Sequence, residues 1–139
     1  MEKLDRSALL VLHHYNDYAW RLVMETAARL TADELTRQSS PSRGSVKGLL
    51  VHCALCEYGF LLRCGVAPFL DDIADPEDLN FGGIRELSSR VEAMRLQYLA
   101  KVTESELDEV VDITIMGKPL RLPRWQMLTQ ALLHSIHHR

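Results

Sequence analysis

The strongest constraint on this fold is a helical repeat of apolar residues that covers four long stretches of the chain. Apolar side chains recur at intervals of three and four in residues 7–30, where no Gly or Pro interrupts them. Similar stretches cover residues 45–64, 83–102 and 123–139. This spacing is typical of amphipathic helices, each of which buries one face. The sequence therefore predicts an all-α fold built from four long helices.

Shorter features are expected between these helices. Thr31 with Glu34, and Thr103 with Glu106, have the capping-box spacing that predicts a short helix at each position. The stretch "SSPSRG" interrupts the helical pattern, and "VVDITIMGKPLRL" alternates apolar and polar residues around a turn, which predicts a hairpin or extended loop. We expect an antiparallel four-helix bundle with a short hairpin-like insertion before the last helix, in a single domain over residues 1–139.

Composition excludes several classes of function. The 139 residues carry 16 Lys and Arg against 19 Asp and Glu, a net charge of -3, and the two signs are mixed along the chain. Nucleic-acid binding is not expected, because no basic stripe is present to contact phosphates. The N-terminal segment is interrupted by charged and polar residues, so we expect neither a signal peptide nor a membrane span, and a cytoplasmic protein. Three cysteines are an odd number, which favours reduced thiols.

Histidines are concentrated on two of the expected helices. In the last helix, His134 and His138 lie on one narrow arc, whereas His137 points to one side. In the second long helix, His52 shares an arc with Cys56 and apolar residues that should face the core. The bundle can therefore bring one imidazole from the second helix to two from the last.

Three neutral imidazoles and a water are a ligand set for a catalytic divalent metal. Nitrogen ligands suit zinc, nickel, copper or iron, and we expect nickel or zinc. The residues alone leave a second interpretation open, in which His52 is a satisfied core histidine and the C-terminal pair only caps a helix. Cys56, one turn after His52, is a further candidate ligand because thiolates bind zinc beside histidine.

The segments "GSVKGLLVHCALCEYGFLLR" and "LPRWQMLTQALLHSIHHR" resemble the two signatures of the DinB/YfiT-like family, and the likeness covers nearly the whole chain. The resemblance implies a four-helix bundle with one metal-binding histidine on the second helix and two in an H-x-x-x-H pair on the last. Those positions correspond here to His52, His134 and His138. Family members usually continue the last helix past Arg139, so we expect that helix to be truncated here or to extend in a longer chain.

The same resemblance implies a metal-dependent enzyme acting on a small molecule, such as a thiol-dependent S-transferase or a related transferase or hydrolase. The implied cofactor is a divalent metal ion, nickel or zinc, with a low-molecular-weight thiol as a candidate co-substrate. The sequence names no general base. The alternative is a non-catalytic, stress-linked helical bundle that serves as a binding or scaffold protein.

Other polar residues have structural interpretations. Cys53 and Cys56 form C-x-x-C in the middle of a helix, which does not favour thioredoxin-like chemistry. His13 and His14 are expected on a polar helix surface, with the alternative that one of them faces the cavity, and Glu57 is expected in a surface or interhelix ion pair. "HSIHH" lacks the glutamate of H-E-x-x-H, so peptidase activity is not expected.

The last helix also suggests self-association. Its apolar residues away from the histidine arc are too numerous for a solvent face, and they are Trp125, Leu128, Leu132 and Ile136. Some of them should pack inside the bundle, and the remainder could form a two-fold interface. We therefore expect a homodimer.

Overall fold

The computed structural model describes residues 3–39, 41 and 44–139, so the expected break at residues 39–44 lies partly outside the described residues. The described chain forms six helices and two strands. In order they are α1 (Arg6–Ala27), α2 (Ala32–Thr36), α3 (Val46–Arg63), α4 (Phe81–Lys101), α5 (Glu104–Asp108), β1 (Val110–Ile115), β2 (Lys118–Pro123) and α6 (Arg124–His138). The structure is mostly helical with one small sheet, as the helical repeat predicts.

Local capping determines where the helices begin. Asp5 caps α1, its side chain accepting a hydrogen bond from the Ala8 backbone N–H at 2.8 Å. Both expected capping boxes are present, with Thr31 at the start of α2 and Thr103 at the start of α5. Such caps satisfy backbone N–H groups that have no partner within the helix. The two capping boxes can be recognised from the sequence alone, so the expected starts of α2 and α5 agree with the structure.

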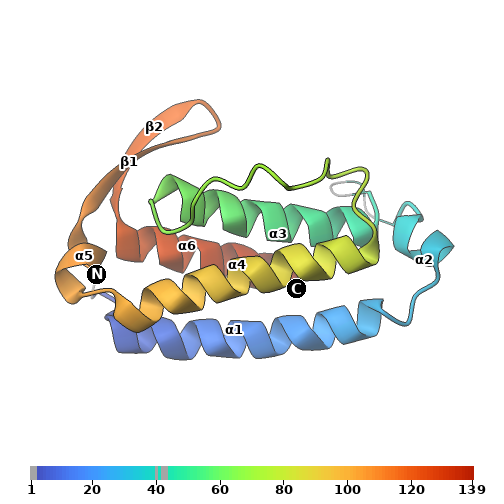
Figure 1. Ribbon diagram of the computed structural model, residues 1–139, viewed down its shortest axis with the longest axis horizontal. Coiled ribbons are helices and arrows are strands. Elements are labelled where there is room, and N and C mark those ends of the chain that lie inside the picture. Colours follow the sequence, from blue (N-terminus) through green and yellow to red (C-terminus); the bar gives the residue numbers. More distant parts are fainter. Residues whose placement is uncertain (1–2, 40, 42–43) are drawn as a thin grey trace.

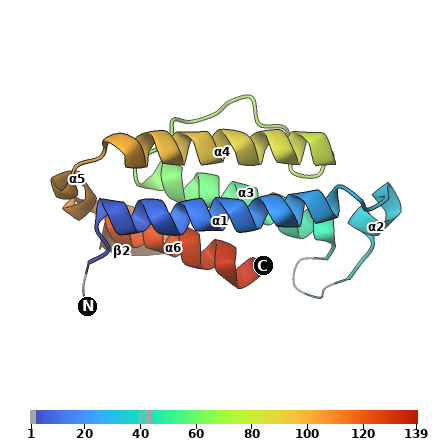
Figure 2. The same cartoon turned by 90° about the horizontal axis from the view of Figure 1, so that it is seen from below.

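Figures 1 and 2 show the four long helices side by side, with α4 and α6 on opposite sides of the pair α1 and α3. α3 and α4 run in the same direction, because residues 64–80 travel back along the bundle before α4 begins. Antiparallel neighbours are therefore α1 with α4 and α3 with α6, whereas the sequence analysis expected antiparallel packing throughout. One long crossover connection is enough to make two consecutive long helices run in the same direction.

The crossover segment, residues 64–80, is fastened to the bundle at defined points. The Tyr58 hydroxyl of α3 donates to the carbonyl oxygen of Pro68 at 3.1 Å and accepts from the Leu70 N–H at 2.7 Å. Arg90 of α4 donates to both carboxylate oxygens of Asp72, at 2.9 and 3.0 Å. A long connection without regular structure needs such side-chain partners for its backbone polar groups.

The core lies between the four long helices. Its most completely buried apolar side chains are Leu9, Leu50, Leu61, Ile84, Val91, Leu99, Leu107, Met127 and Leu128. Three of the four α6 residues that suggested an interface, Trp125, Leu128 and Leu132, are buried in the chain's own bundle, and Ile136 is 45% exposed. Within the described residues, no helix has both the length and the apolar character to cross a membrane.

The expected insertion before the last helix is a hairpin. β1 and β2 pair antiparallel from Val110 opposite Pro123 to Ile115 opposite Lys118. Gly117, at the turn, has a φ of 76°, which suits a glycine in a two-residue hairpin connection. Arg124 ties the base of the hairpin to the bundle, since its Nε donates to the carbonyl oxygen of Cys64 at 3.0 Å.

Candidate metal centre

Two histidines from different helices meet at the boundary between α3 and α6. His52 lies in the first half of α3 and His134 near the end of α6, and these helices are antiparallel neighbours. Their Nε2 atoms are 3.1 Å apart, and both side chains are only partly buried. The sequence analysis expected this meeting of one imidazole from each helix.

Cys56 extends the pair to a cluster of three ligand atoms. It lies one helical turn after His52, and its Sγ is 3.4 Å from Nδ1 and 3.7 Å from Nε2 of that ring. Ligand atoms of His52, Cys56 and His134 all lie within 4.8 Å of one another. Because residues four apart lie one above the other on a helix, a single helix supplies two of these three groups.

His138 joins the cluster through its ring. Its ring centroid is 4.9 Å from that of His52 and 4.5 Å from that of His134. His137, expected to point aside, is exposed and packs against His138 at 4.9 Å. Phe60 forms an apolar wall 5.8 Å from His134. The three predicted ligands are thus adjacent, and the full three-histidine set stays a prediction.

Two distances in this cluster are close to those between ligands of a tetrahedral ion. With metal–nitrogen bonds of about 2.0–2.1 Å and metal–sulfur bonds of about 2.3 Å, tetrahedral ligands stand roughly 3.3 Å apart for two nitrogens and roughly 3.5 Å apart for nitrogen and sulfur. The observed separations are 3.1 Å between the two Nε2 atoms and 3.7 Å between Nε2 of His52 and Sγ of Cys56. His52, Cys56 and His134 therefore fit a divalent metal such as zinc.

The remaining thiols and histidines of the sequence analysis occupy structural positions. Cys53 is buried in the middle of α3, as expected for a C-x-x-C without redox chemistry. Burial raises the pKa of Cys64 to about 11, which keeps that thiol protonated. His14 is exposed as expected. His13 is 1% exposed, so it is the one of the two histidines that faces the bundle interior, as the alternative allowed, and the favoured surface position is wrong for it.

A buried ionic cluster lies on another side of α3. Arg95 of α4 is fully buried and donates to Asp17 of α1 through one terminal nitrogen and to Glu57 of α3 through the other. The interhelix pair expected for Glu57 is therefore confirmed, whereas the sequence analysis missed Asp17 and Arg95. A lone arginine in an amphipathic helix has no spacing that marks it as buried, because most arginines lie on the surface.

The electrostatics of this cluster follow from burial. Burial raises the pKa of Glu57, and the positive charge of Arg95 opposes that rise only in part. For Arg95, burial acts to lower the pKa, but the carboxylates of Glu57 and Asp17 outweigh it and raise the pKa. Burial also lowers the pKa of His13 to about 3, and the Arg95 charge acts in the same direction. The interior therefore holds a charged guanidinium and an uncharged imidazole.

Comparisons with known proteins agree with this architecture. A family model described as the DinB family matches residues 3–139. The crystal structure of a DinB-like protein from Bacillus cereus ATCC 10987 superposes with a TM-score of 0.68 at 15% sequence identity, covering 96% of this chain and 85% of that one. At this identity the likeness shows the fold alone. No curated protein matches this sequence.

Proposed function

Because the chain belongs to the DinB family, we propose that it is a metal-dependent enzyme that binds a divalent ion between α3 and α6 and acts on a small molecule. The observation that carries the proposal is the approach of His52 and His134, whose Nε2 atoms lie 3.1 Å apart with the Cys56 sulfur beside them. Nitrogen and sulfur atoms at such separations are typical of zinc and related borderline ions.

When bound, the ion would act as a Lewis acid toward a substrate oxygen or sulfur. The chain's own residues supply the rest of the site. His52 and His134 would hold the ion from two helices, and the ring of Phe60 provides apolar surface beside His134. All four candidate ligands are partly exposed, so a small molecule can reach them from solvent. Open coordination positions are what a catalytic site needs.

Two ligand sets are candidates for the site, and they differ in the third protein ligand. The sequence analysis favours His138, which gives an all-nitrogen set suited to nickel or zinc, whereas the ligand-atom cluster favours Cys56, which gives a mixed set suited to zinc. The ring of His138 packs on both other rings, with centroids 4.9 Å from His52 and 4.5 Å from His134. We propose His52, His134 and His138 as ligands, with Cys56 as an additional or exchanging one.

Metal content tests the site directly. Protein purified without chelator is expected to carry close to one divalent ion per chain by elemental analysis. His52→Ala should lose most of it, because one of two converging helices then offers no imidazole. His137→Ala is the matched control, since His137 lies next to His138 but is exposed, and it should keep the ion. Equal metal content in His52→Ala and wild type would refute the site.

Affinity distinguishes the two ligand sets. Zinc titration of His138→Ala and Cys56→Ser, in competition with a chromogenic chelator, should weaken binding most in the variant that removes a true ligand. A loss of about tenfold to a hundredfold is expected for that variant, as for other losses around metal sites. Weak binding in His138→Ala with unchanged binding in Cys56→Ser would select the three-histidine set, and the reverse result would select the mixed one.

For the reaction we propose thiol transfer with a low-molecular-weight co-substrate. The sulfur of bacillithiol, mycothiol or glutathione would displace chloride from a model electrophile such as chlorodinitrobenzene, forming a thioether and releasing the chloride and a proton. Coordination chemistry favours this because a bound ion promotes loss of a thiol proton. Product formation that requires both a thiol and the metal, and that His52→Ala loses, would support it. Activity equal to the uncatalysed rate with all three thiols would contradict it.

Self-association is a second proposal, carried by an exposed stripe on α1. Val11, Tyr15, Tyr18 and Leu22 share one helix face and are 47–69% exposed. A face of this kind suits a homodimer interface, and it equally suits the alternative function as a non-catalytic binding or scaffold protein. In sedimentation velocity, wild type should be dimeric at micromolar concentration. Tyr15→Lys with Tyr18→Lys should be monomeric, whereas Met116→Lys at the exposed hairpin tip should not change the state.

The two functional classes give different outcomes. A protein that dimerises but binds no ion and transfers no thiol would favour the scaffold. A monomeric wild type would refute the interface and leave the enzyme proposal to be judged by its own assays.

A further inference from the structure

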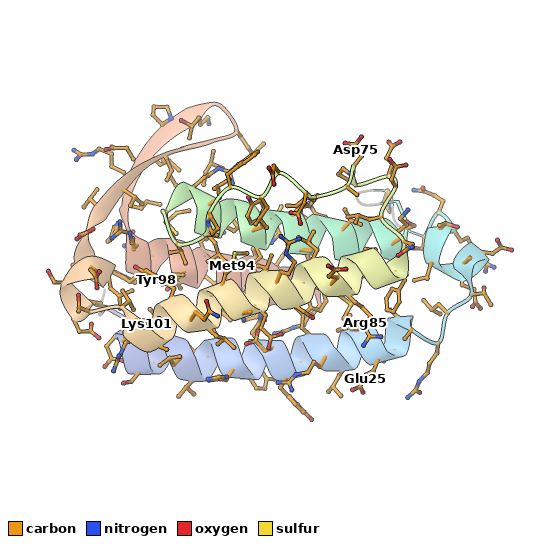
Figure 3. The ribbon with its side chains drawn as sticks, in the orientation of Figure 1. Glu25, Asp75, Arg85, Met94, Tyr98 and Lys101 are labelled. Carbon is orange, nitrogen blue, oxygen red and sulfur yellow. The ribbon has the colours of Figure 1, made fainter. Side chains whose placement is uncertain are left out.

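A cavity of about 660 Å³ lies between α1 and α4, apart from the histidine cluster. Residues from both helices line it, and α3 contributes one residue, Glu57. Figure 3 labels Glu25 on α1 and Arg85 on α4, two lining residues at the same end of the bundle. This volume is in the range of pockets that hold small molecules.

The inner part of the cavity is acidic. Asp17 and Glu57 lie against the single guanidinium of Arg95, and the half-buried Glu92 is a third carboxylate on the lining. Asp17 and Arg95 are 3% and 1% exposed, yet within the described residues Oδ2 of Asp17 and Nε of Arg95 have no hydrogen-bond partner. Buried polar atoms usually have partners. Three carboxylates against one guanidinium leave this inner part ready to accept hydrogen bonds from a cation.

The mouth of the cavity is basic. Arg21 of α1, Arg29 in the turn after α1 and Arg85 of α4 are exposed lining residues. Glu25 is the one exposed carboxylate among the lining residues that the structure describes. Within the same part of the chain, none of these three arginines forms an ion pair. Arg21 makes only a hydrogen bond of 3.4 Å to the Asp17 carbonyl oxygen on its own helix. Unpaired guanidinium groups at a cavity mouth suit carboxylate or phosphate.

From this separation of charge we propose that the cavity binds a small zwitterion, with its ammonium group at Asp17 and Glu57 and its carboxylate or phosphate at the mouth arginines. A free α-amino acid and an aminoalkyl phosphate have this chemistry in common. Trp20 and Met24 also line the cavity, and they provide apolar surface for the carbon atoms between the two charged ends. A purely cationic or purely anionic ligand would be attracted by one end and repelled by the other.

The inference is independent of the metal proposal. None of the cavity's lining residues is a candidate metal ligand, and the histidine cluster lies between α3 and α6 rather than between α1 and α4. Glu57 follows Cys56 directly in the sequence but faces a different helix, because consecutive residues point about 100° apart on an α-helix. Loss of either site is therefore expected to leave ligand binding at the other.

The test is calorimetric titration with the twenty standard α-amino acids and phosphoethanolamine. At least one probe should bind wild type with a Kd below about 1 mM. Its N-acetyl derivative lacks the cation, and the amide of a carboxylate probe, or ethanolamine for phosphoethanolamine, lacks the anion. Each of these forms should bind about tenfold more weakly or worse, since a charge-assisted hydrogen bond is lost.

Variants place the binding at the cavity. Arg85→Ala changes an exposed side chain at the mouth and should weaken binding about tenfold or more without affecting the fold. Asp17→Asn should weaken binding by a similar factor from the inner end, together with the loss of stability expected for a buried partner of Arg95. Lys101→Ala is the matched control, an exposed cation at the opposite end of α4 (Figure 3), and it should bind as wild type does. His52→Ala should also bind normally.

Three results would overturn the inference. They are the absence of binding by every probe, equal binding of a probe and its singly charged derivatives, and unchanged affinity in Arg85→Ala. Since Arg85 is exposed and makes no ion pair within the described residues, the weaker binding expected of Arg85→Ala cannot be attributed to misfolding.

Discussion

The two polar clusters of this bundle have opposite physical character, although α3 contributes to both. The histidine cluster between α3 and α6 is partly exposed, and its imidazoles are neutral when they bind metals. The ionic cluster of Asp17, Glu57 and Arg95 is buried and charged. Cys56 and Glu57 are consecutive, so a single step along α3 passes from one cluster to the other.

Because of this difference, the two clusters are expected to contribute differently to the stability of the fold and to its chemistry. A buried guanidinium between carboxylates loses hydration that only its partners replace, so each partner becomes indispensable to the fold. Partly exposed imidazoles can exchange a protein contact for water or an ion at small cost. The ionic cluster is thus expected to dominate the stability of the folded state, and the histidine cluster to dominate its response to metals.

The largest expected effect comes from Arg95→Met, which leaves the carboxylates of Asp17 and Glu57 buried without their cation. The free energy of unfolding should fall by about 3–5 kcal/mol in urea denaturation. Arg90→Met is the matched control on α4, because the ion pair of Arg90 with Asp72 is exposed to solvent and should contribute little to the free energy of unfolding. Equal losses in the two variants would show that burial does not separate the two kinds of ion pair.

The second effect concerns metal addition. Zinc at about a hundredfold excess over its Kd should raise the free energy of unfolding by about 2.7 kcal/mol, because the ion binds only the folded state. His52→Ala should lack this increase. Glu57→Gln, one residue from Cys56 but in the other cluster, should retain it to within about 0.5 kcal/mol if the clusters are independent. A metal-induced increase that disappears in Glu57→Gln would mean that the two clusters are coupled through α3.

The third effect is a pH dependence from His13. Its pKa is lowered to about 3 in the folded protein, whereas an exposed histidine has a value of about 6.5, so the unfolded chain binds the extra proton between these values. The contribution of His13 to the free energy of unfolding is therefore fully present above pH 6.5, and it is lost as the pH is lowered toward 3. At pH 5 the loss should be about 2 kcal/mol.

Comparison with His13→Gln isolates that loss. The raised pKa of Glu57 acts with the opposite sign, because the folded state then binds the proton more readily and gains stability as the pH falls. Glu57 is present in both proteins, so its contribution largely cancels in the difference between their unfolding free energies. A difference that is constant from pH 7.5 to pH 4.5 would contradict a neutral buried ring at position 13.

The smallest expected loss of stability comes from Tyr58, which lies on α3 but belongs to neither of the two clusters. Tyr58→Phe removes the hydroxyl that contacts Pro68 and Leu70 in the crossover segment, and it should lower the free energy of unfolding by about 1 kcal/mol. Hydrogen exchange at the Leu70 amide should accelerate in the variant. A loss as large as that of Arg95→Met would mean that attachment of this segment, rather than buried charge, dominates stability.

The features predicted from the sequence are those that depend on neighbouring residues. Thr31 and Thr103 mark helix starts because a cap needs only the next three residues. The pairing of His134 with His138 follows from helical spacing, and His52 lies on an expected core face. Such local signals are present in the sequence without knowledge of which helices are neighbours.

The features that were missed depend on tertiary contacts. The parallel directions of α3 and α4 result from the path of residues 64–80, for which no periodic pattern gives a direction. Arg95 is buried because carboxylates from two other helices surround its guanidinium, and its own helix shows only an ordinary polar position there. Which of His13 and His14 is buried, and how near the candidate ligand Cys56 lies to His134, likewise depend on how the helices pack.

The crossover segment divides the chain into two complementary pieces. Residues before it contain Asp17, His52 and Glu57, while residues after it contain Arg95 and His134, so neither piece holds a complete version of either cluster. A chain cut within this segment would therefore regain its metal affinity only by reassembly of the two fragments. Split at that point, the protein would act as a reporter of fragment complementation, with zinc binding as the signal that the two halves have met.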